Sequence, residues 1–396
     1  MLAIKGGKIF TITNGIIENG IILVENSKIS QVGTDVSIPE DCRVIDASGN
    51  SIFPGMIDAH THLGVIQEGL RSMGLDHNEK SDPITPQLRV IDAIDPFDPA
   101  FDEVMKAGIT TVLIAPGSAN PIGGQCSVVK TVGKTVEEML LVKNAGIKFA
   151  LGENPKVTYG SRNLSPYTRM GVAAIIRENL CKAYEYSVNK ESQLMNEDIA
   201  VLKTDLKMEA LSNVVNGKIR ARIHAHKASD IMTAIRIGEE FDLDIVLEHC
   251  TEGDKVISEI ARHGIPVVLS PLMSPRTKPE TKERGMEIAA RLAARGILVA
   301  ISTDGISQSA RWLPINAGLC VRYGMKEEDA MKAITINAAK ILGLDNRLGS
   351  IEKHKDADII IMKGHPLETR TRISAVIIEG KVKYLRAEIL EQKEAE

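Results

Sequence analysis

The middle of the chain alternates between short apolar runs and helical stretches, and this alternation limits the possible folds more than any other feature. Apolar runs bounded by helices are typical of parallel strands that are covered on both faces. The strands expected from this pattern are 52–59, 110–115, 126–131, 147–152, 219–224, 244–247, 266–269 and 298–301, with a hairpin partner for the third at 139–142. Eight such strands predict an α/β fold, the (β/α)8 TIM barrel.

Both ends of the chain have a different pattern. Short strands separated by turns are expected at 2–5, 8–13, 20–25, 28–32 and 43–46, and again at 358–362, 375–378 and 381–385. We expect the two ends to form one small β-sandwich, made of residues 1–51 and 355–390, with the barrel of residues 52–354 inserted between them. Residues 169–215 predict a helical insert longer than a barrel requires.

Composition excludes some classes of partner. A net charge of -4 and an aromatic content of 3% disfavour nucleic-acid binding, which needs basic surfaces and stacking platforms. No apolar run is long enough to span a membrane, and the N-terminus lacks the pattern of a signal peptide. The five cysteines show no CxxC spacing, as expected for reduced thiols. We therefore expect a cytoplasmic protein with no membrane or nucleic-acid partner.

Histidine pairs follow two of the expected strands. In His60-Thr61-His62 both imidazoles point to one face, at the C-terminal end of the first barrel strand, where TIM barrels place active sites. A chance pair is the alternative for this motif alone. A second pair, His224-Ala225-His226, also follows an apolar strand and makes coincidence a weaker explanation.

Two further strands end in groups of the same kind. His249 follows the run 245–248, and Asp304 follows the run 297–303. Asp304 precedes a glycine and could simply begin a tight turn. Taken together, imidazole and carboxylate groups at four strand ends of one barrel are a ligand set suited to zinc, iron or manganese.

The chain resembles the amidohydrolase superfamily, in particular its imidazolonepropionase-like and amide-hydrolysing branches, over essentially its whole length. The motifs that carry the resemblance are residues 53–62 (FPGMIDAHTH), 223–226 (IHAH), 247–249 (LEH), 302–304 (STD), 349–352 (GSIE) and 355–358 (KDAD). The resemblance also implies the composite sandwich read from the termini.

The resemblance implies a metal site with an aspartate that acts as the base toward the attacking water. The residues that match its ligand and base positions are His60, His62, His224 and His249 as metal ligands and Asp304 as the catalytic base. Many members bridge two ions with a carboxylated lysine after strand four, and some use a glutamate. We expect Glu153 to be the bridge, because Lys148 begins the expected strand and would lie too deep; a surface carboxylate is the alternative for Glu153.

Substrate-binding candidates lie near these ligands. His226 points to the same side as His224, could be confused with it, and is expected to support the site or face the substrate. Tyr159 and Arg162 follow Glu153 closely, and the planar fork of Arg162 could hold a substrate carboxylate. A solvated surface arginine is an equally good interpretation of Arg162.

We therefore expect a metal-dependent hydrolase of a carbon–nitrogen bond in a non-peptide amide, cyclic amide or dipeptide-like molecule. One or two divalent ions, zinc first but also iron, cobalt or manganese, would activate a hydroxide, with Asp304 as general base. The partner would be a small molecule, with a carboxylate as one option, and relatives suggest a homo-oligomer. The alternatives are a deaminase of an amino-substituted heterocycle, disfavoured because Lys227 and not a glutamate follows His226, and a catalytically silent scaffold.

Overall fold

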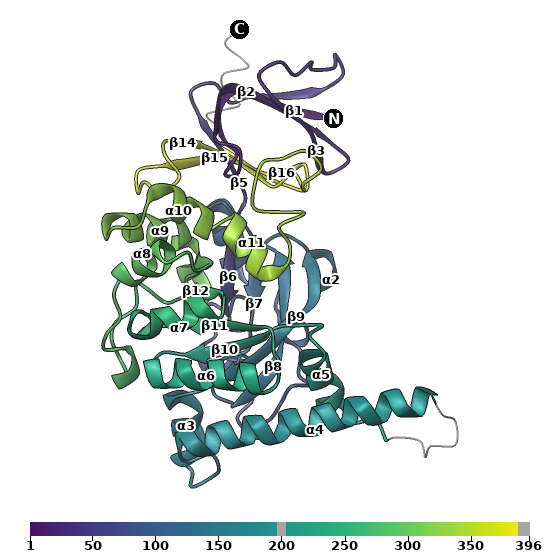
Figure 1. Cartoon of the computed structure of the whole chain (residues 1–396). Helices are drawn as coiled ribbons and strands as arrows, with labels where there is room; N and C mark the ends of the chain where they lie inside the picture. The colour runs from purple at the N-terminus through teal and green to yellow at the C-terminus, as the bar shows by residue number, and fades with distance from the viewer. Residues whose placement is uncertain (196–202, 387–396) are drawn as a thin grey trace.

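Two eight-stranded sheets organise the residues that the computed structural model describes, which are 1–195 and 203–386 (Figure 1). One sheet is the barrel, and the other is built from both ends of the chain and sits at one end of it (Figure 1).

The barrel sheet confirms the predicted TIM barrel. Its order is β13-β12-β11-β10-β9-β8-β7-β6, and a parallel bridge from Thr61 to Gly305 links the two ends of this order. The strands are β6 (Met56–Thr61), β7 (Ile109–Ile114), β8 (Ile122–Lys130), β9 (Leu140–Ala150), β10 (Ala221–Ala225), β11 (Ile245–His249), β12 (Val267–Leu269) and β13 (Val299–Ile301).

The third and fourth strands differ from the prediction. β8 runs antiparallel to both of its neighbours, β7 and β9. The expected hairpin partner at 139–142 and the expected fourth strand are one continuous strand, β9. β9 ends at Ala150, so residue 148 lies near its C-terminal end and not at its start.

Helices surround the barrel because each buries one apolar stripe. α6 (Ala228–Glu240), for example, buries Ile231, Ala234, Ile235 and Gly238, the spacing of one helical face. The other helices on the barrel are α1 (Pro99–Lys106), α2 (Val136–Met139), α3 (Glu153–Gly160), α7 (Ile257–Arg262), α8 (Glu287–Ala294), α9 (Leu313–Arg322), α10 (Glu327–Ala333) and α11 (Ile336–Leu342), with 3-10 turns η1 (Arg71–Gly74), η2 (Val90–Asp92), η3 (Gly253–Val256), η4 (Pro279–Thr281) and η5 (Ser307–Trp312).

The predicted helical insert consists of two helices in its described part. α4 (Arg169–Met195) and α5 (Leu206–Val215) pack together, and α4 projects from the barrel (Figure 1). Residues 196–202 of this insert lie outside the described residues. Within 1–195 and 203–386, none of the helices combines the length and the apolar character needed to cross a membrane.

The second sheet joins the two ends of the chain, as predicted. Its order is β16-β15-β14-β5-β1-β2-β3, with β4 paired to β1. The strands are β1 (Leu2–Phe10), β2 (Ile16–Glu25), β3 (Lys28–Gly33), β4 (Arg43–Asp46), β5 (Ser51–Pro54), β14 (Ile359–Lys363), β15 (Arg372–Ile378) and β16 (Lys381–Leu385). Residues 387–390 of the predicted sandwich lie outside the described residues.

The chain passes from this sheet to the barrel at Gly55. The expected single strand 52–59 is divided here into β5 and β6. A Cβ atom at Gly55 would lie 2.1 Å from Oγ1 of Thr110, so a larger residue would push the two strands apart. Close packing against β7 thus explains the glycine.

A buried ion pair also joins the two sheets. Lys130 at the end of β8 is 3% exposed and donates to the carboxylate of Asp358, which lies one residue before β14 and is 5% exposed. Asp358 also accepts a hydrogen bond from the backbone N–H of Glu379.

We expect Lys130→Met to lower the free energy of unfolding by about 3–5 kcal/mol, because it leaves a buried carboxylate without its cation. Lys106→Met is the matched control, since Lys106 forms an exposed pair with Asp102, and it should cost less than about 1 kcal/mol. Urea unfolding followed by circular dichroism measures both. Equal effects of the two substitutions would show that the buried pair does not stabilise the junction.

Candidate active site

The five predicted histidines and Asp304 meet at the C-terminal mouth of the barrel. His60 lies in β6 with His62 just after it, His224 lies in β10 with His226 just after it, His249 ends β11, and Asp304 follows β13. All of them except His60 line a cavity of about 280 Å³. His60 is fully buried beside it, with Nε2 3.3 Å from Oδ1 of Asp304.

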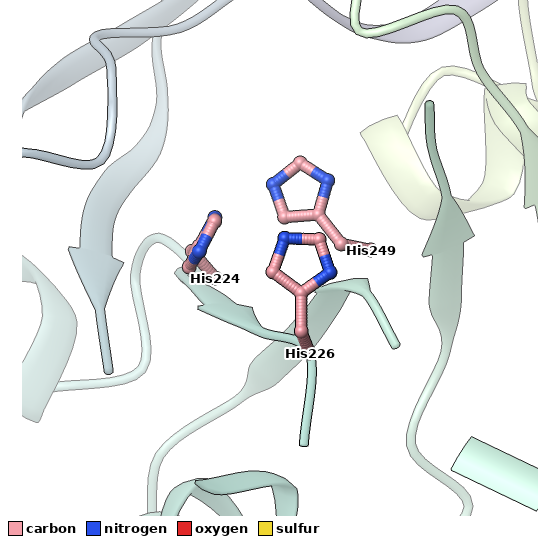
Figure 2. Close-up of side chains that lie close together, drawn as sticks. All are labelled: His224, His226 and His249. Carbon is pink, nitrogen blue, oxygen red and sulfur yellow. The ribbon is translucent and has the colours of Figure 1, made fainter. Parts of the chain in front are cut away.

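Two groups of these side chains have the spacing of metal ligands. Figure 2 shows the rings of His224, His226 and His249 gathered around one space, and each ring offers a nitrogen within 4.8 Å of the others. His60, His249 and Asp304 form a second group by the same measure. Nδ1 of His224 is buried and has no hydrogen-bond partner in the described structure. These donors fit one or two divalent transition-metal ions.

Hydrogen bonds from the outer ring nitrogens orient these histidines. Nδ1 of His62 lies 2.8 Å from the carbonyl oxygen of Ala115, and Nδ1 of His249 lies 2.8 Å from that of Ser270. A carbonyl only accepts, so each Nδ1 must carry the proton and each Nε2 keeps a free lone pair. His226 makes a similar contact to the Thr251 hydroxyl, at 2.7 Å.

Burial keeps three of the imidazoles neutral. Removal from water lowers the pKa of His224, His226 and His249 well below the usual range. Neighbouring cationic groups, Lys148 for His224 and His249 among them, act in the same direction. Neutral imidazole is the form that binds metals.

Glu248 is a site residue that the sequence reasoning missed. It is fully buried one position before His249, with Oε1 2.9 Å from Nδ1 of His60 and 2.8 Å from Nε of Arg222, and it accepts a further bond from Lys148. Burial alone would raise the pKa of Glu248, but the charges of His60, Lys148 and Arg222 hold that pKa well below its usual range. The sequence did contain a signal for this cluster: Lys148, Arg222 and Glu248 are charged residues inside the apolar runs of β9, β10 and β11.

Lys148 and Glu153 are placed differently from the expectation. Lys148 is not too deep: it lines the cavity, and its Nζ lies 3.3 Å from Nε2 of His60. Glu153 begins α3, is absent from the residues that line the cavity, and uses its backbone N–H to bond Oε2 of Glu280 at 2.9 Å. The difference follows from the length of β9 and from Gly152, whose φ of 83° turns the chain away from the strand.

Asp304 sits in a constrained turn. Its φ is 54°, an uncommon conformation that often occurs at functional sites. Ser302 and Thr303 hold this turn by donating hydroxyl hydrogen bonds to the buried carboxylate of Asp58, whose pKa burial raises to about 6. Burial would raise the pKa of Asp304 as well, but the contacts of its carboxylate with the imidazoles of His60 and His62 hold that pKa well below the usual range.

The structure does not bring Tyr159 or Arg162 to the cavity, which corrects the expectation that they face the barrel mouth. The Tyr159 hydroxyl is buried and donates to Oδ1 of Asn120 at 2.6 Å. Arg162 is exposed, donates to the carbonyls of Thr158 and Lys80, and lies over the Tyr159 ring. Asn154 at the start of α3 lines the cavity, whereas Tyr159 and Arg162, at the end of α3 and in the turn after it, do not.

Two other cations line the cavity instead. Lys278 and Arg284 come from the loop after β12, together with Thr281. Sequence reasoning missed both, because residues 270–286 show no strand or helix period and contain several cations that are indistinguishable by pattern.

A TIM barrel with this group of imidazoles and a carboxylate at its C-terminal mouth defines a class of hydrolase. The profile of the Amidohydrolase family matches residues 51–383, and the chain belongs to this family. It is a hydrolase that acts on carbon–nitrogen bonds.

Named relatives agree with this class. The chain is 28% identical over 391 residues to amidohydrolase tasK of Hapsidospora irregularis, covering 92% of this chain but only 40% of that protein. It is 25% identical over 373 residues to an imidazolonepropionase of Geobacillus sp., covering 87% of this chain and 84% of that one.

Solved structures extend the comparison. A crystal structure of an amidohydrolase from Thermotoga maritima has 42% identity and a TM-score of 0.94, covering 98% of this chain and 100% of that one. A prolidase complexed with N-methylphosphonate-L-proline has 16% identity and a TM-score of 0.60, covering 97% of this chain and 100% of that one, and shows the fold alone.

The positions of Lys148 and Glu153 lead to a test by metal content. We expect Lys148→Arg, which keeps the charge opposite Glu248 but moves the nitrogen, to lower the metal bound per chain. Glu153→Gln should leave it unchanged, because Glu153 does not line the cavity. Elemental analysis of the purified variants, with circular dichroism as the folding check, measures this. Loss of metal in Glu153→Gln alone would return the bridging role to Glu153.

Proposed function

We propose that the protein is a metal-dependent hydrolase that cleaves the amide bond of a small molecule, with Asp304 as its base. The observation that carries the proposal is the convergence of five imidazoles, Lys148 and Asp304 at one end of the barrel. The cavity volume of about 280 Å³ suits a small substrate.

The proposed ligands fall into two sets. His60 and His62 would hold one divalent ion, and His224 and His249 the other, with zinc, iron, cobalt and manganese all suited to these donors. The contact between His226 and this second set supports His226 as a further ligand or a substrate contact. Lys148, 3.3 Å from His60, replaces Glu153 as the proposed bridge, in the carboxylated form that the superfamily resemblance implies.

Asp304 would carry the proton during hydrolysis. A divalent ion held by these residues would supply hydroxide near neutral pH and would polarise the carbonyl of the substrate. The depressed pKa of Asp304 keeps it an acceptor at neutral pH. Asp304 would act first as a base, taking the proton of the attacking water, and then as an acid, giving that proton to the departing nitrogen. Nε2 of His60 lies 3.3 Å and Nε2 of His62 lies 3.5 Å from Oδ1 of Asp304, and these distances support a place for this carboxylate beside the proposed metal ligands.

One observation favours deamination as a second candidate. A deaminase uses a glutamate near the strand-five histidine, and the motif after His226 lacks one. The loop after β12 places Glu280, which is 1% exposed, with Oε1 3.8 Å from Nε2 of His224 and 3.9 Å from Nε2 of His226. Glu280 does not line the cavity, so hydrolysis of an amide remains the leading proposal.

A substrate screen separates these functions. The metal-loaded protein is tested against N-acyl amino acids, dipeptides, lactams, cyclic ureides and amino-substituted heterocycles, with product identity read by mass spectrometry and ammonia measured separately. Release of an acid and an amine supports the leading proposal, whereas ammonia from heterocycles supports the second. A folded, metal-free protein with no activity would support a silent scaffold. The cytoplasmic location and the homo-oligomer remain predictions.

The role of Asp304 has its own test. We expect Asp304→Asn to reduce kcat by about 10²–10⁴-fold, because an amide cannot accept the proton. The fold should persist, since asparagine tolerates the positive φ of this position. Asp242→Asn is a matched control, because Asp242 is exposed and has a similar φ of 51°; its kcat should not change. Near-normal turnover by Asp304→Asn, with metal content intact, would move the base role to another group.

A further inference from the structure

We propose that Arg284 binds a carboxylate of the substrate beside the scissile amide, which makes it a specificity-determining residue. This inference rests on the proposed function, and it replaces Arg162 as the anion-binding residue.

The position of Arg284 supports the proposal. It lies in the loop after β12, is 9% exposed, and lines the same cavity as His249 and Asp304. Its Nε is buried and has no hydrogen-bond partner among the described residues. Its guanidinium therefore retains donor capacity at the wall of the cavity.

The charges around the cavity favour an anion at this arginine. Lys278, the other cation from this loop that lines the cavity, donates to Oδ1 of Asn154 and lies 3.8 Å from Oε1 of Glu280. Arg284 has no carboxylate within 4.0 Å in residues 1–195 and 203–386, and Asp304 acts on it only from farther away. A buried cation without a counter-ion is costly, and a ligand that supplies the anion removes that cost.

Arg284 is also held in place before any ligand binds. Its Nη1 donates to the carbonyls of Ser274 and Pro275, at 3.0 and 2.9 Å. Nη2 of Arg276 donates to the carbonyl of Arg284 at 2.8 Å, which fixes its backbone. A positioned guanidinium loses little side-chain entropy on binding, and its planar fork matches a carboxylate.

Arg162 lacks these properties. It is exposed, and its Nε and Nη2 donate to the carbonyls of Thr158 and Lys80. The substrate class that follows is an amide with a free carboxylate close to the scissile bond, such as an N-acyl amino acid or a dipeptide.

Binding of a matched pair tests the inference without depending on turnover. Calorimetric titration of the metal-loaded protein with N-acetylglycine and with N-acetylglycinamide compares a carboxylate with its neutral isostere. We expect the acid to bind at least about tenfold more tightly than the amide, as for a charged hydrogen-bonded pair. Arg284→Met should abolish this ratio, and Arg284→Lys should retain part of it because the charge remains without the fork.

Two controls make the test specific. Arg295→Met removes an exposed arginine at the end of α8 and should keep the wild-type ratio. Metal content should be unchanged in every variant, since Arg284 donates to the backbone carbonyls of Ser274 and Pro275 and to no proposed metal ligand among the described residues. If Arg284→Met does not fold, Arg284→Lys still decides the outcome by the partial loss of preference.

The results that overturn the proposal are distinct from failure of the proposed function. No binding of the acid to the wild type, equal binding of acid and amide, or a ratio unchanged in the Arg284 variants would each refute it. Loss of the ratio in Arg162→Met but not in Arg284→Met would assign the anion to Arg162. Absence of hydrolysis of every amide would refute the proposed function, while the binding ratio would still report on Arg284.

Discussion

The geometry of the barrel mouth depends on one buried carboxylate, Glu248 on β11. An isolated charge in that position would cost several kcal/mol, and three cationic or polar groups offset this cost. They are Lys148 of β9, Arg222 of β10 and His60 of β6. One carboxylate therefore fixes the relative positions of four strands, three of which also carry histidines of the site. Apolar packing could stabilise the barrel interior equally well, so the role of this ion cluster is best understood as positioning.

Much of the fold was predictable because buried strands need apolar side chains on both faces, and that pattern is visible without a structure. Strand direction is not visible in this way: β8 has the same apolar pattern as its neighbours, although it runs antiparallel to them. The break between β5 and β6 was also hidden, since the apolar run continues through it. The break falls at Pro54-Gly55, and Gly55 packs so closely on Thr110, which is distant in sequence, that no larger residue fits there.

The histidines could be placed from the sequence because spacing by two residues at a strand end fixes both direction and location. Lys148 was misplaced by an error in one strand boundary, which moved it from the mouth to the base of the barrel. Glu153 was misplaced for the same reason, since the residues after Gly152 already belong to α3. Arg284 lies in the loop between β12, which ends at Leu269, and α8, which begins at Glu287, so only the folded loop brings it to the cavity.

The loop after β12 connects recognition with the catalytic strands through Glu280. Oε2 of Glu280 accepts the backbone N–H of Glu153 at the start of α3, and Oε1 lies near His224 and His226. A Cβ atom at Gly152 would approach Oε2 of Glu280 to 2.9 Å, so the turn after β9 leaves room for this carboxylate. Lys278 and Arg284 flank Glu280 in the same loop. The loop that carries Lys278 and Arg284 thus also places a buried carboxylate beside the strand-five histidines.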